Sequence, residues 1–373
     1  MKEININQLR DEIDSLDSQL VQLLAKRSKV TRQVGLYKTI KGVPVYVPAR
    51  ENELLAKRKK QAEALGVSPE LVEDLLRRIM RESYQSQHKH YHCSNNDINK
   101  IVIFGGNGAL GKAFVNMFRI SGYTVEVVEK DDWDRVESVV VDADLVIISV
   151  PINVTSAVIE SLPKLPDHCI LADLTSIKDE PLTAMMEKHS GPVVGLHPMF
   201  GPDGSFVKQV VVVCDGRGSE HYKWLLDQIT IWGCITYNSA PQEHDSAMQM
   251  IQIMRHFSTF VYGRNLQLEN PDLDKLMAFS SPIYRLELAM VGRLFAQNAQ
   301  LYTDIIFSSK QAIELLKHYI NTYEDAVKML ESDDKEGFKK AFDEVSDWFG
   351  DYAVSFQKES KSLLLKANDQ RSL

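Results

Sequence analysis

The sequence predicts a multidomain protein in which an all-α domain comes first, an α/β domain follows and a second all-α domain ends the chain. Three patterns predict this order: apolar residues recur every three or four positions before residue 90, short apolar runs alternate with helical segments from 99 to 240, and long helical runs fill 241–373. A chain of 373 residues is long enough for two or three domains. We therefore expect domains at residues 1–90, 99–240 and 241–373.

The N-terminal domain begins with one long amphipathic helix. No glycine or proline interrupts its pattern before Gly35, and if it continues to about Lys41 it is roughly 50 Å long, at about 1.5 Å per residue. A second helix should run from Pro48 to about Ala64, and a third should start at Pro69. These two are too short to cover the first, so we expect a second copy of the chain to complete the core. The exposed stripe would comprise Leu9, Ile13, Leu16, Leu20, Leu23, Val30 and Val34.

A polar stretch from 85 to 99 has no apolar periodicity, and we interpret it as the linker between the first two domains. It contains the alternating histidines His88, His90 and His92, a spacing that can bind metal. The stretch offers no carboxylate cluster beside them, so we expect no metal site there.

The middle of the chain has the pattern of an open parallel sheet with helices on both faces. The strand-like runs span residues 101–104, 124–128, 145–150, 170–174, 193–196 and 210–214, and they stop near Ala240.

A glycine-rich turn follows the first of these runs and opens a helix. Its glycines, Gly106, Gly108 and Gly111, allow a tight turn and bring backbone N–H groups at the positive helix end close to a pyrophosphate. The next run ends at Glu129, where a carboxylate can bind both ribose hydroxyls and repel a 2′-phosphate. We therefore predict a Rossmann-like domain that binds NAD in preference to NADP.

Other polar motifs also lie at the carboxyl ends of the predicted strands, where open α/β sheets bind their ligands. Ser149 and Pro151 follow the third run, and we expect both to border the cofactor. His197 follows the fifth run and is a candidate base beside the nicotinamide, because an imidazole titrates near neutral pH.

Two stretches resemble prephenate dehydrogenase: Leu196-His197-Pro198-Met199-Phe200-Gly201 and residues 280–293, which read Ser-Ser-Pro-Ile-Tyr-Arg-Leu-Glu-Leu-Ala-Met-Val-Gly-Arg. The resemblance runs from about Ile101 to the C-terminus and implies oxidative decarboxylation of prephenate to 4-hydroxyphenylpyruvate, CO2 and NADH. It implies that His197 takes the proton of the ring hydroxyl, that Ser176 hydrogen-bonds His197, and that the helical C-terminal domain mediates dimerisation. Prephenate carries two carboxylates, and the cations implied for them are Arg293, Lys178 and Arg285, with Arg293 on the ring carboxylate.

The apolar side of the first helix carries two cations, Arg27 and Lys38. A charge on a core face is costly unless it is paired, so we expect both cations to meet an anionic ligand. With their neighbours they resemble the all-helical chorismate mutase domain, which forms an intertwined dimer. The resemblance implies that Arg27, Lys38 and the Arg10 of a second copy bind the carboxylates and the ether oxygen of chorismate. The other implied contacts are Glu51 and Gln87 on the hydroxyl and the ether oxygen, with Arg50 and Ser83 at the rim.

Charge and hydropathy exclude other classes of partner. The net charge is −8 and no basic block is present, which argues against nucleic acid or an anionic membrane as a partner. The sequence has no apolar run of about 18 residues and no signal-peptide pattern at its N-terminus, so we expect a cytoplasmic protein.

Two other interpretations remain open at this point. The chain could be an NAD-dependent dehydrogenase of another small acid, such as arogenate or a hydroxy acid, with an inert helical dimerisation arm; or it could be a non-enzymatic NAD sensor. Arg27 and Lys38 argue against an inert arm, and a sensor leaves His197, Ser176 and Arg293 unexplained. The order of mutase, linker and dehydrogenase resembles the bifunctional fusions of tyrosine biosynthesis, so we also expect a homodimer and feedback inhibition by tyrosine at the Arg293 site.

Overall fold

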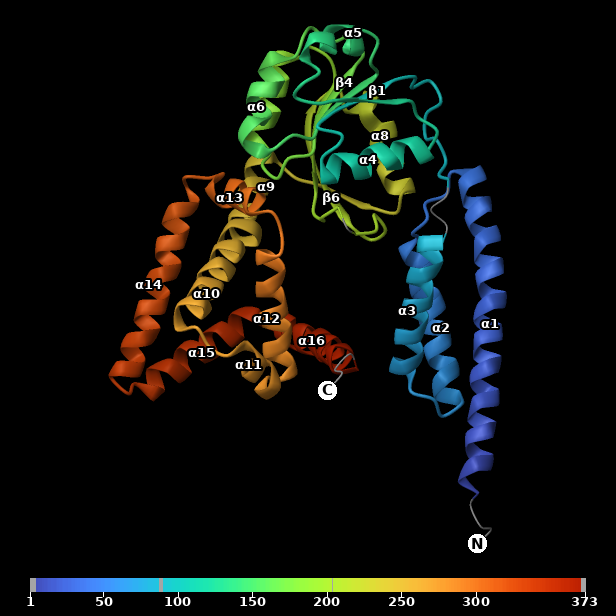
Figure 1. The fold of residues 1–373 in the computed structure, drawn as a ribbon, viewed down its shortest axis with the longest axis vertical. Helices are drawn as coiled ribbons and strands as arrows, with labels where there is room; N and C mark the ends of the chain where they lie inside the picture. The colour runs from blue at the N-terminus through green and yellow to red at the C-terminus, as the bar shows by residue number, and fades with distance from the viewer. Residues whose placement is uncertain (1–4, 87–89, 203, 370–373) are drawn as a thin grey trace. The chain divides into compact units, whose positions relative to one another are not determined.

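The computed structural model describes residues 5–86, 90–202 and 204–369 and divides into two compact units, Met1–His244 and Asp245–Leu373. Figure 1 shows the first unit as a group of three helices, α1 to α3, followed by a sheet with helices around it. The second unit contains helices throughout the part that the structure describes. The predicted order of helical, α/β and helical parts is therefore confirmed.

The three N-terminal helices have the bounds that local sequence signals predict: α1 is Ile6–Lys41, α2 is Pro48–Ala64 and α3 is Pro69–Ser86. The Asn5 side chain caps α1 by accepting from the N–H groups of Asn7 and Gln8. Gly42 ends it with a φ of 65°, a left-handed conformation that glycine adopts without steric cost.

The apolar stripe of α1 is not covered within one chain. Leu16 and Leu20 are 54% and 57% exposed, and Leu71 and Leu75 of α3 are also exposed. An apolar row of this length that remains in water is what the sequence pattern predicted for a helix completed by a second copy.

The stretch predicted to be a simple linker is instead fixed to the α/β part. Helix α3 continues through Ser86, and the Tyr91 side chain is buried while its N–H donates to the Ile120 carbonyl at 3.1 Å. Ser94 is held in place as well, because its N–H donates to Gln228 Oε1 at 2.9 Å and its hydroxyl donates to the Trp224 carbonyl at 2.9 Å. Apolar periodicity did not predict this docking, because much of it depends on hydrogen bonds.

The sheet has seven strands in the order β2-β1-β3-β4-β5-β6-β7. The strands are β1 (Ile101–Phe104), β2 (Val125–Val128), β3 (Leu145–Ile148), β4 (Ile170–Asp173), β5 (Val193–Pro198), β6 (Val210–Arg217) and β7 (Ile235–Asn238). The first five are mutually parallel where they pair, and their carboxyl ends share one edge of the sheet.

Two features of the sheet differ from the expectation of a wholly parallel sheet of six strands. Strand β6 runs antiparallel to β5, because the segment between them forms no helix that could make the crossover a parallel pair requires. Strand β7 pairs with β6 at the sheet edge and was missed, since it is short and largely exposed and so lacks an apolar run.

Helices cover both faces of the sheet. Helices α4 (Ala109–Ile120) and α8 (Ser219–Ile231) pack on one face, around Phe114, Phe118 and Trp232. Helices α5 (Val136–Val140), α6 (Ile152–Ser161) and α7 (Asp179–Lys188) pack on the other face, with a short 3-10 turn, η1 (Trp133–Arg135), before α5. The strands between them are buried on both sides, which explains their continuous apolar runs.

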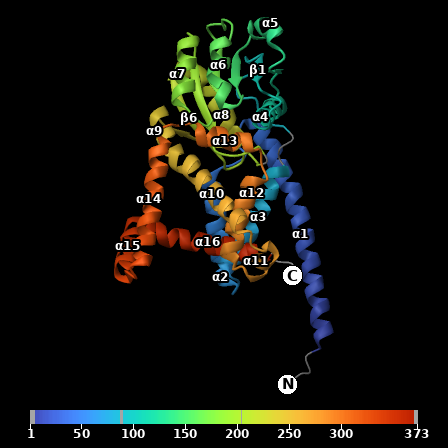
Figure 2. The same ribbon diagram turned by 60° about the vertical axis from the view of Figure 1, so that its left-hand side comes forward.

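Helix α9 (Pro241–Met248) passes from the first unit into the second, and a π-helical turn, η2 (Gln249–Met254), continues it. The second unit then contains α10 (Arg255–Glu269), α11 (Leu273–Phe279), α12 (Pro282–Phe295), α13 (Ala299–Phe307), α14 (Ala312–Glu331), α15 (Lys335–Phe349) and α16 (Asp351–Asp369). Figure 2 shows α15 turning back from the end of α14. Among the described residues, no helix is both long and apolar enough to cross a membrane.

Candidate active sites

The glycine-rich turn lies between β1 and α4 and has no room for side chains. A Cβ on Gly106 would lie 2.8 Å from a Val127 methyl, and a Cβ on Gly111 would lie 2.4 Å from the Gly105 carbonyl oxygen. Gly108 is the N-cap of α4 and offers no side-chain hydrogen bond to the helix. Only glycine therefore fits this closely packed turn at the N-terminus of α4, the kind of helix end that binds phosphates in other proteins.

Gly105 belongs to this turn and was not among the predicted glycines. Its φ is 74°, and a Cβ there would lie 2.4 Å from the Ser149 carbonyl oxygen. The sequence signal was present, because Gly105 and Gly106 stand together directly after a strand. Ser149 follows β3 and Pro151 is the N-cap of α6, so the predicted cofactor residues gather at one edge of the sheet.

Glu129 follows β2 and turns its carboxylate toward the same turn. Its Oε1 accepts the N–H of Asn107 at 2.8 Å, and its own N–H donates to Asp132 at 2.8 Å. A carboxylate held beside the glycine turn fits a ribose diol and repels an added phosphate. The residues present thus fit a dinucleotide with an unphosphorylated ribose.

His197 lies inside β5 and is 4% exposed. Its Nδ1 lies 2.7 Å from Nε2 of His244, which α9 supplies, and the two rings meet edge to face with centroids 5.0 Å apart. Burial, reinforced by the charges of Lys178 and His244, holds the pKa of His197 well below its usual value. A neutral imidazole is the form that can accept a proton.

Lys178 lies beside a carboxylate in the first unit. It is fully buried, forms an ion pair with Asp173, and donates to the Leu196 carbonyl at 3.0 Å. Asp173 also accepts from the backbone N–H of Thr175 at 3.0 Å. The charge of this buried lysine acts on the imidazole of His197, and the predicted contact of Lys178 with a substrate carboxylate stays a prediction.

The remaining predicted dehydrogenase residues lie in different units. Ser176 is half-buried between β4 and α7, beside Thr175 in the first unit. Arg285 and Arg293 both lie on α12 in the second unit, and Arg293 is exposed in its last turn. Their contacts with prephenate and the Ser176 to His197 hydrogen bond therefore stay predictions.

In the helical domain the structure brings two predicted mutase residues together. Arg27 on α1 donates to the hydroxyl of Ser83 on α3 at 2.9 Å. Lys38 donates to the Val45 carbonyl at 2.6 Å. Burial lowers the pKa of the Arg27 guanidinium and of the Lys38 ammonium, because both are half removed from water. Desolvated cations of this kind attract anionic ligands.

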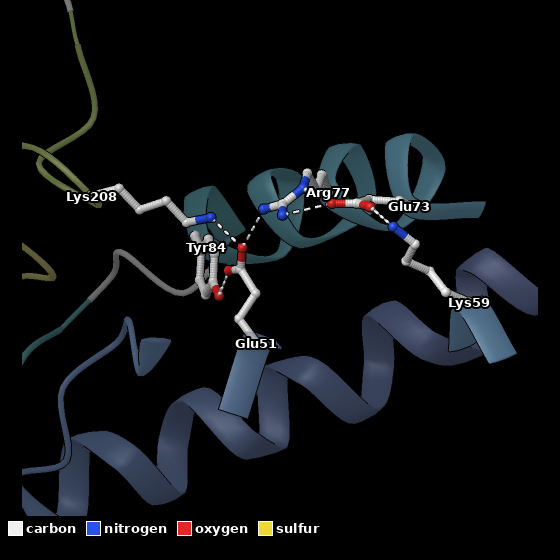
Figure 3. Close-up of polar contacts among 6 residues, drawn as sticks. All are labelled: Glu51, Lys59, Glu73, Arg77, Tyr84 and Lys208. Carbon is white, nitrogen blue, oxygen red and sulfur yellow. Dashed lines mark hydrogen bonds and ion pairs between the residues drawn. The ribbon is translucent and has the colours of Figure 1, made fainter. Parts of the chain in front are cut away.

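Glu51 is the most buried charged residue of the helical domain, at 4% exposure. Figure 3 shows the contacts of its carboxylate. Oε1 accepts from Arg77 at 3.0 Å and from Lys208 at 2.5 Å, and Oε2 accepts the Tyr84 hydroxyl at 3.0 Å. Burial and the Glu51 carboxylate raise the pKa of Tyr84. The sequence did not predict these three partners of Glu51. Arg77 and Tyr84 could have been found, since they lie on one face of α3.

Three further mutase predictions, for Arg10, Arg50 and Gln87, stay predictions. Arg10 is exposed on α1, and its predicted role is in a second copy. Arg50 is exposed and pairs with Glu53 at 3.0 Å. Gln87 and His88 lie outside the described residues.

His92 contacts the Thr39 carbonyl oxygen through Nδ1 at 3.1 Å. No group of three or more metal-binding side chains occurs among the residues that the structure describes.

Comparison with known families divides the chain in the same order. Residues 9–88 match chorismate mutase type II, residues 121–233 match the nucleotide-binding domain of prephenate dehydrogenase, and residues 240–344 match its dimerization domain. The second match begins after the glycine turn, so the assignment of that turn rests on its geometry.

Whole-chain relatives have the same two parts. The chain is 53% identical to a T-protein of Enterobacter agglomerans over 97% of this chain and 98% of that protein. It is 51% identical to a T-protein of Haemophilus influenzae over 98% and 97% of the two chains.

Solved structures support the dehydrogenase fold. The prephenate dehydrogenase of A. aeolicus, solved with hydroxyphenyl propionate and NAD+, aligns with a TM-score of 0.52 at 16% identity and covers 67% of this chain and 96% of that one. A Synechocystis arogenate dehydrogenase aligns with a TM-score of 0.51 at 18% identity, over 68% and 99% of the two chains. Taken together with the two-part matches, these findings place the chain in the T-protein family, the bifunctional chorismate mutase and prephenate dehydrogenase enzymes of tyrosine biosynthesis.

Proposed function

We propose that the two activities use separate sites in one chain, the mutase site around Arg27 and Lys38 and the dehydrogenase site around His197. The observation that supports this division is that each set of residues is buried in its own domain, with contacts of its own. Chorismate is rearranged to prephenate at the first site, and prephenate is oxidised and decarboxylated at the second.

The mutase reaction is a pericyclic rearrangement and needs no acid, base or nucleophile. Arg27, Lys38 and the Arg10 of a second copy hold the two carboxylates, and the cations also stabilise the negative charge that develops on the ether oxygen. Two half-buried cations whose pKa values burial lowers support this assignment, because an anion restores the stabilisation that water no longer gives them.

NAD is the cofactor of the dehydrogenase, and when bound it supplies the hydride acceptor. Its pyrophosphate binds at the turn of Gly106, Gly108 and Gly111, whose close packing admits only glycine, and Glu129 takes the ribose hydroxyls. Ser149 and Pro151 line the sheet edge next to them.

His197 accepts the proton of the ring hydroxyl through Nε2 as hydride leaves the same ring carbon. The C–O bond becomes a carbonyl and the ring carboxylate departs as CO2. The electron pair of the broken C–C bond moves through the ring to the carbonyl oxygen, which takes a proton, so the ring becomes an aromatic phenol. This role needs Nε2 of His197 to be unprotonated, and in that tautomer the Nδ1–H donates to Nε2 of His244 over the 2.7 Å that separates them. Ser176 hydrogen-bonds the same imidazole, and Arg293 and Arg285 bind the substrate carboxylates.

A coupled assay tests both sites in one chain. The purified protein receives chorismate and NAD without prephenate, and NADH is followed by absorbance. Reduction of NAD is the expected result. If NADH formed neither from chorismate nor from added prephenate, while arogenate or a hydroxy acid supported it, the assignment of the second substrate would be wrong.

The finer properties of the enzyme follow from the same residues. The uncovered stripe of α1 and the match of residues 240–344 to a dimerization domain support a homodimer, which sedimentation would test.

Tyrosine has the ring and side-chain carboxylate of the product, so we expect it to compete for the Arg293 site. An unchanged dehydrogenase rate at saturating tyrosine would contradict this. The protein acts in the cytoplasm, where chorismate and NAD are available.

A further inference from the structure

Lys208 belongs to the segment that joins β5 to β6, ten residues after Pro198 and two before Val210. Its backbone has a φ of 67°, a conformation that residues other than glycine rarely adopt and that surrounding contacts must hold in place. Its N–H donates to the Gly233 carbonyl at 2.8 Å. Phe206, two residues earlier, packs into the aromatic core with ring centroids 5.2 Å from Phe114 and 5.7 Å from Trp232. The segment therefore presents Lys208 in a fixed place.

The Lys208 side chain leaves the dehydrogenase domain and enters the helical domain, as Figure 3 shows. Its Nζ contacts Oε1 of Glu51 at 2.5 Å and lies 4.9 Å from the centre of the Tyr46 ring and 6.0 Å from that of Tyr84. An ammonium held between a carboxylate and two aromatic faces is in an environment that stabilises its charge.

Glu51 is nearly inaccessible to water, so its charge needs cations close by. Arg77 is one, but it also pairs with Glu73 at 2.8 Å, and Glu73 is itself bound by Lys59 at 2.7 Å. Arg77 therefore divides its charge between two carboxylates. Among the described residues, Lys208 forms its ion pair with Glu51. The helical domain supplies only part of the positive charge that neutralises the Glu51 carboxylate, and Lys208 supplies the rest.

The three donors also set the direction of the carboxylate. Oε1 receives Arg77 and Lys208, whereas Oε2 receives the Tyr84 hydroxyl. A carboxylate oxygen accepts about two hydrogen bonds, and among the described residues Oε1 receives two and Oε2 one, so Oε2 is the oxygen that would take a substrate hydroxyl.

We propose that Lys208, contributed by the dehydrogenase domain, is a positioning residue of the mutase site that acts through Glu51. This inference rests on the proposed contact of Glu51 with the chorismate hydroxyl. It implies that the mutase site is incomplete without the dehydrogenase domain, because the segment that carries Lys208 is the one that continues from His197.

The experiment measures mutase turnover in the full-length chain for Lys208→Met, Lys208→Arg, Glu51→Gln and the double variant Lys208→Met/Glu51→Gln. Lys208→Met should lower mutase kcat/KM about tenfold, mainly through KM, because a charge-assisted hydrogen bond of a partly exposed lysine is lost. Lys208→Arg should restore most of the activity. In the Glu51→Gln background, Lys208→Met should have little further effect.

Matched controls separate positioning from folding. Lys223→Met removes an exposed lysine of α8 that pairs with Asp227 and should leave mutase turnover unchanged. NADH formation from prephenate reports on the fold of the domain that carries Lys208. A parallel loss of both activities in Lys208→Met, or an equal effect with and without Glu51, would overturn the inference.

The result for Glu51→Gln distinguishes a wrong role of Lys208 from a wrong role of Glu51. If Glu51→Gln lowers mutase turnover and Lys208→Met does not, the role of Lys208 is wrong while that of Glu51 stands. If Glu51→Gln leaves mutase turnover unchanged, the proposed role of Glu51 is itself wrong, and the role of Lys208 falls with it.

Discussion

The Nδ1 atom of His197 lies 2.7 Å from the Nε2 atom of His244, and both imidazoles are buried. At this distance one of the two nitrogens carries a proton and donates it to the other. The contact joins β5 to α9 and orients the imidazole of His197 through Nδ1.

Replacing His197 with asparagine should abolish NADH formation from prephenate and leave the mutase working. An amide cannot take the hydroxyl proton, so kcat should fall by about 10²- to 10⁴-fold. Stopped assays of prephenate formation from chorismate would provide the control in the same preparation. Loss of both activities with the fold intact would mean that the sites are not separate.

Arg27→Ala should produce the opposite result. Removing a desolvated guanidinium that binds a carboxylate should lower mutase kcat/KM about 100-fold or more, with dehydrogenase turnover unchanged. The matched control is Arg58→Ala, because Arg58 is an exposed arginine of α2 that contacts Gln61. An equal loss in both variants would point to a general effect of surface charge.

The dehydrogenase should tolerate mild acid. Burial and the charges of Lys178 and His244 lower the pKa of His197, so the neutral, proton-accepting form persists as the pH falls through 6.5 and is lost only at lower pH. A profile of kcat/KM against pH should therefore stay flat from pH 8 through 6.5 and decline only well below pH 6.5. Mutase turnover over the same range shows whether the chain remains folded. An acidic limb centred above 6.5 would contradict the inferred environment.

Lys178→Met should destabilise the first unit strongly, because it leaves the Asp173 carboxylate buried without its cation. A single break of a buried pair costs about 3–5 kcal/mol in the free energy of unfolding. The double variant Asp173→Leu/Lys178→Met should recover part of the loss. Urea midpoints from the fluorescence of Trp224 and Trp232 would measure both, and a Lys178→Met midpoint equal to that of the wild type would show that the pair contributes little.

Gly111→Ala should weaken cofactor use without affecting the mutase. The added Cβ would lie 2.4 Å from the Gly105 carbonyl oxygen, so the turn must move away from the position that fits a pyrophosphate. We expect the KM for NAD to rise about 10- to 100-fold. Gly204→Ala is the control, since its Cβ would lie at an ordinary 3.6 Å from the nearest atom. Equal KM values for the two variants would argue against this cofactor turn.

Local signals predicted the helices of the first domain and the start of the cofactor turn. Pro48, Ser68-Pro69 and Gly42 act on their own backbone, so the end of α1 and the starts of α2 and α3 could be predicted from the sequence. The apolar runs also predicted β1 to β6, because strands buried on both faces are continuously apolar.

Strand direction and the docking of the linker needed the folded chain. The antiparallel pairing of β5 and β6 depends on the absence of a helical crossover between them, and β7 pairs at an edge where no apolar run marks it. Residues 90–99 are held by polar contacts to Trp224 and Gln228, which periodicity does not detect.

The sequence by itself determined which residues are chemically unusual: cations on an apolar helix face, glycines after a strand, a histidine at a strand end. Only the tertiary structure decided their partners. Lys178 pairs with Asp173, and Glu51 pairs with Lys208 at a sequence separation of 157 residues. The physical reason is that a charge's role depends on which opposite charge and how much water lie within a few ångströms, and those distances exist only once the chain has folded.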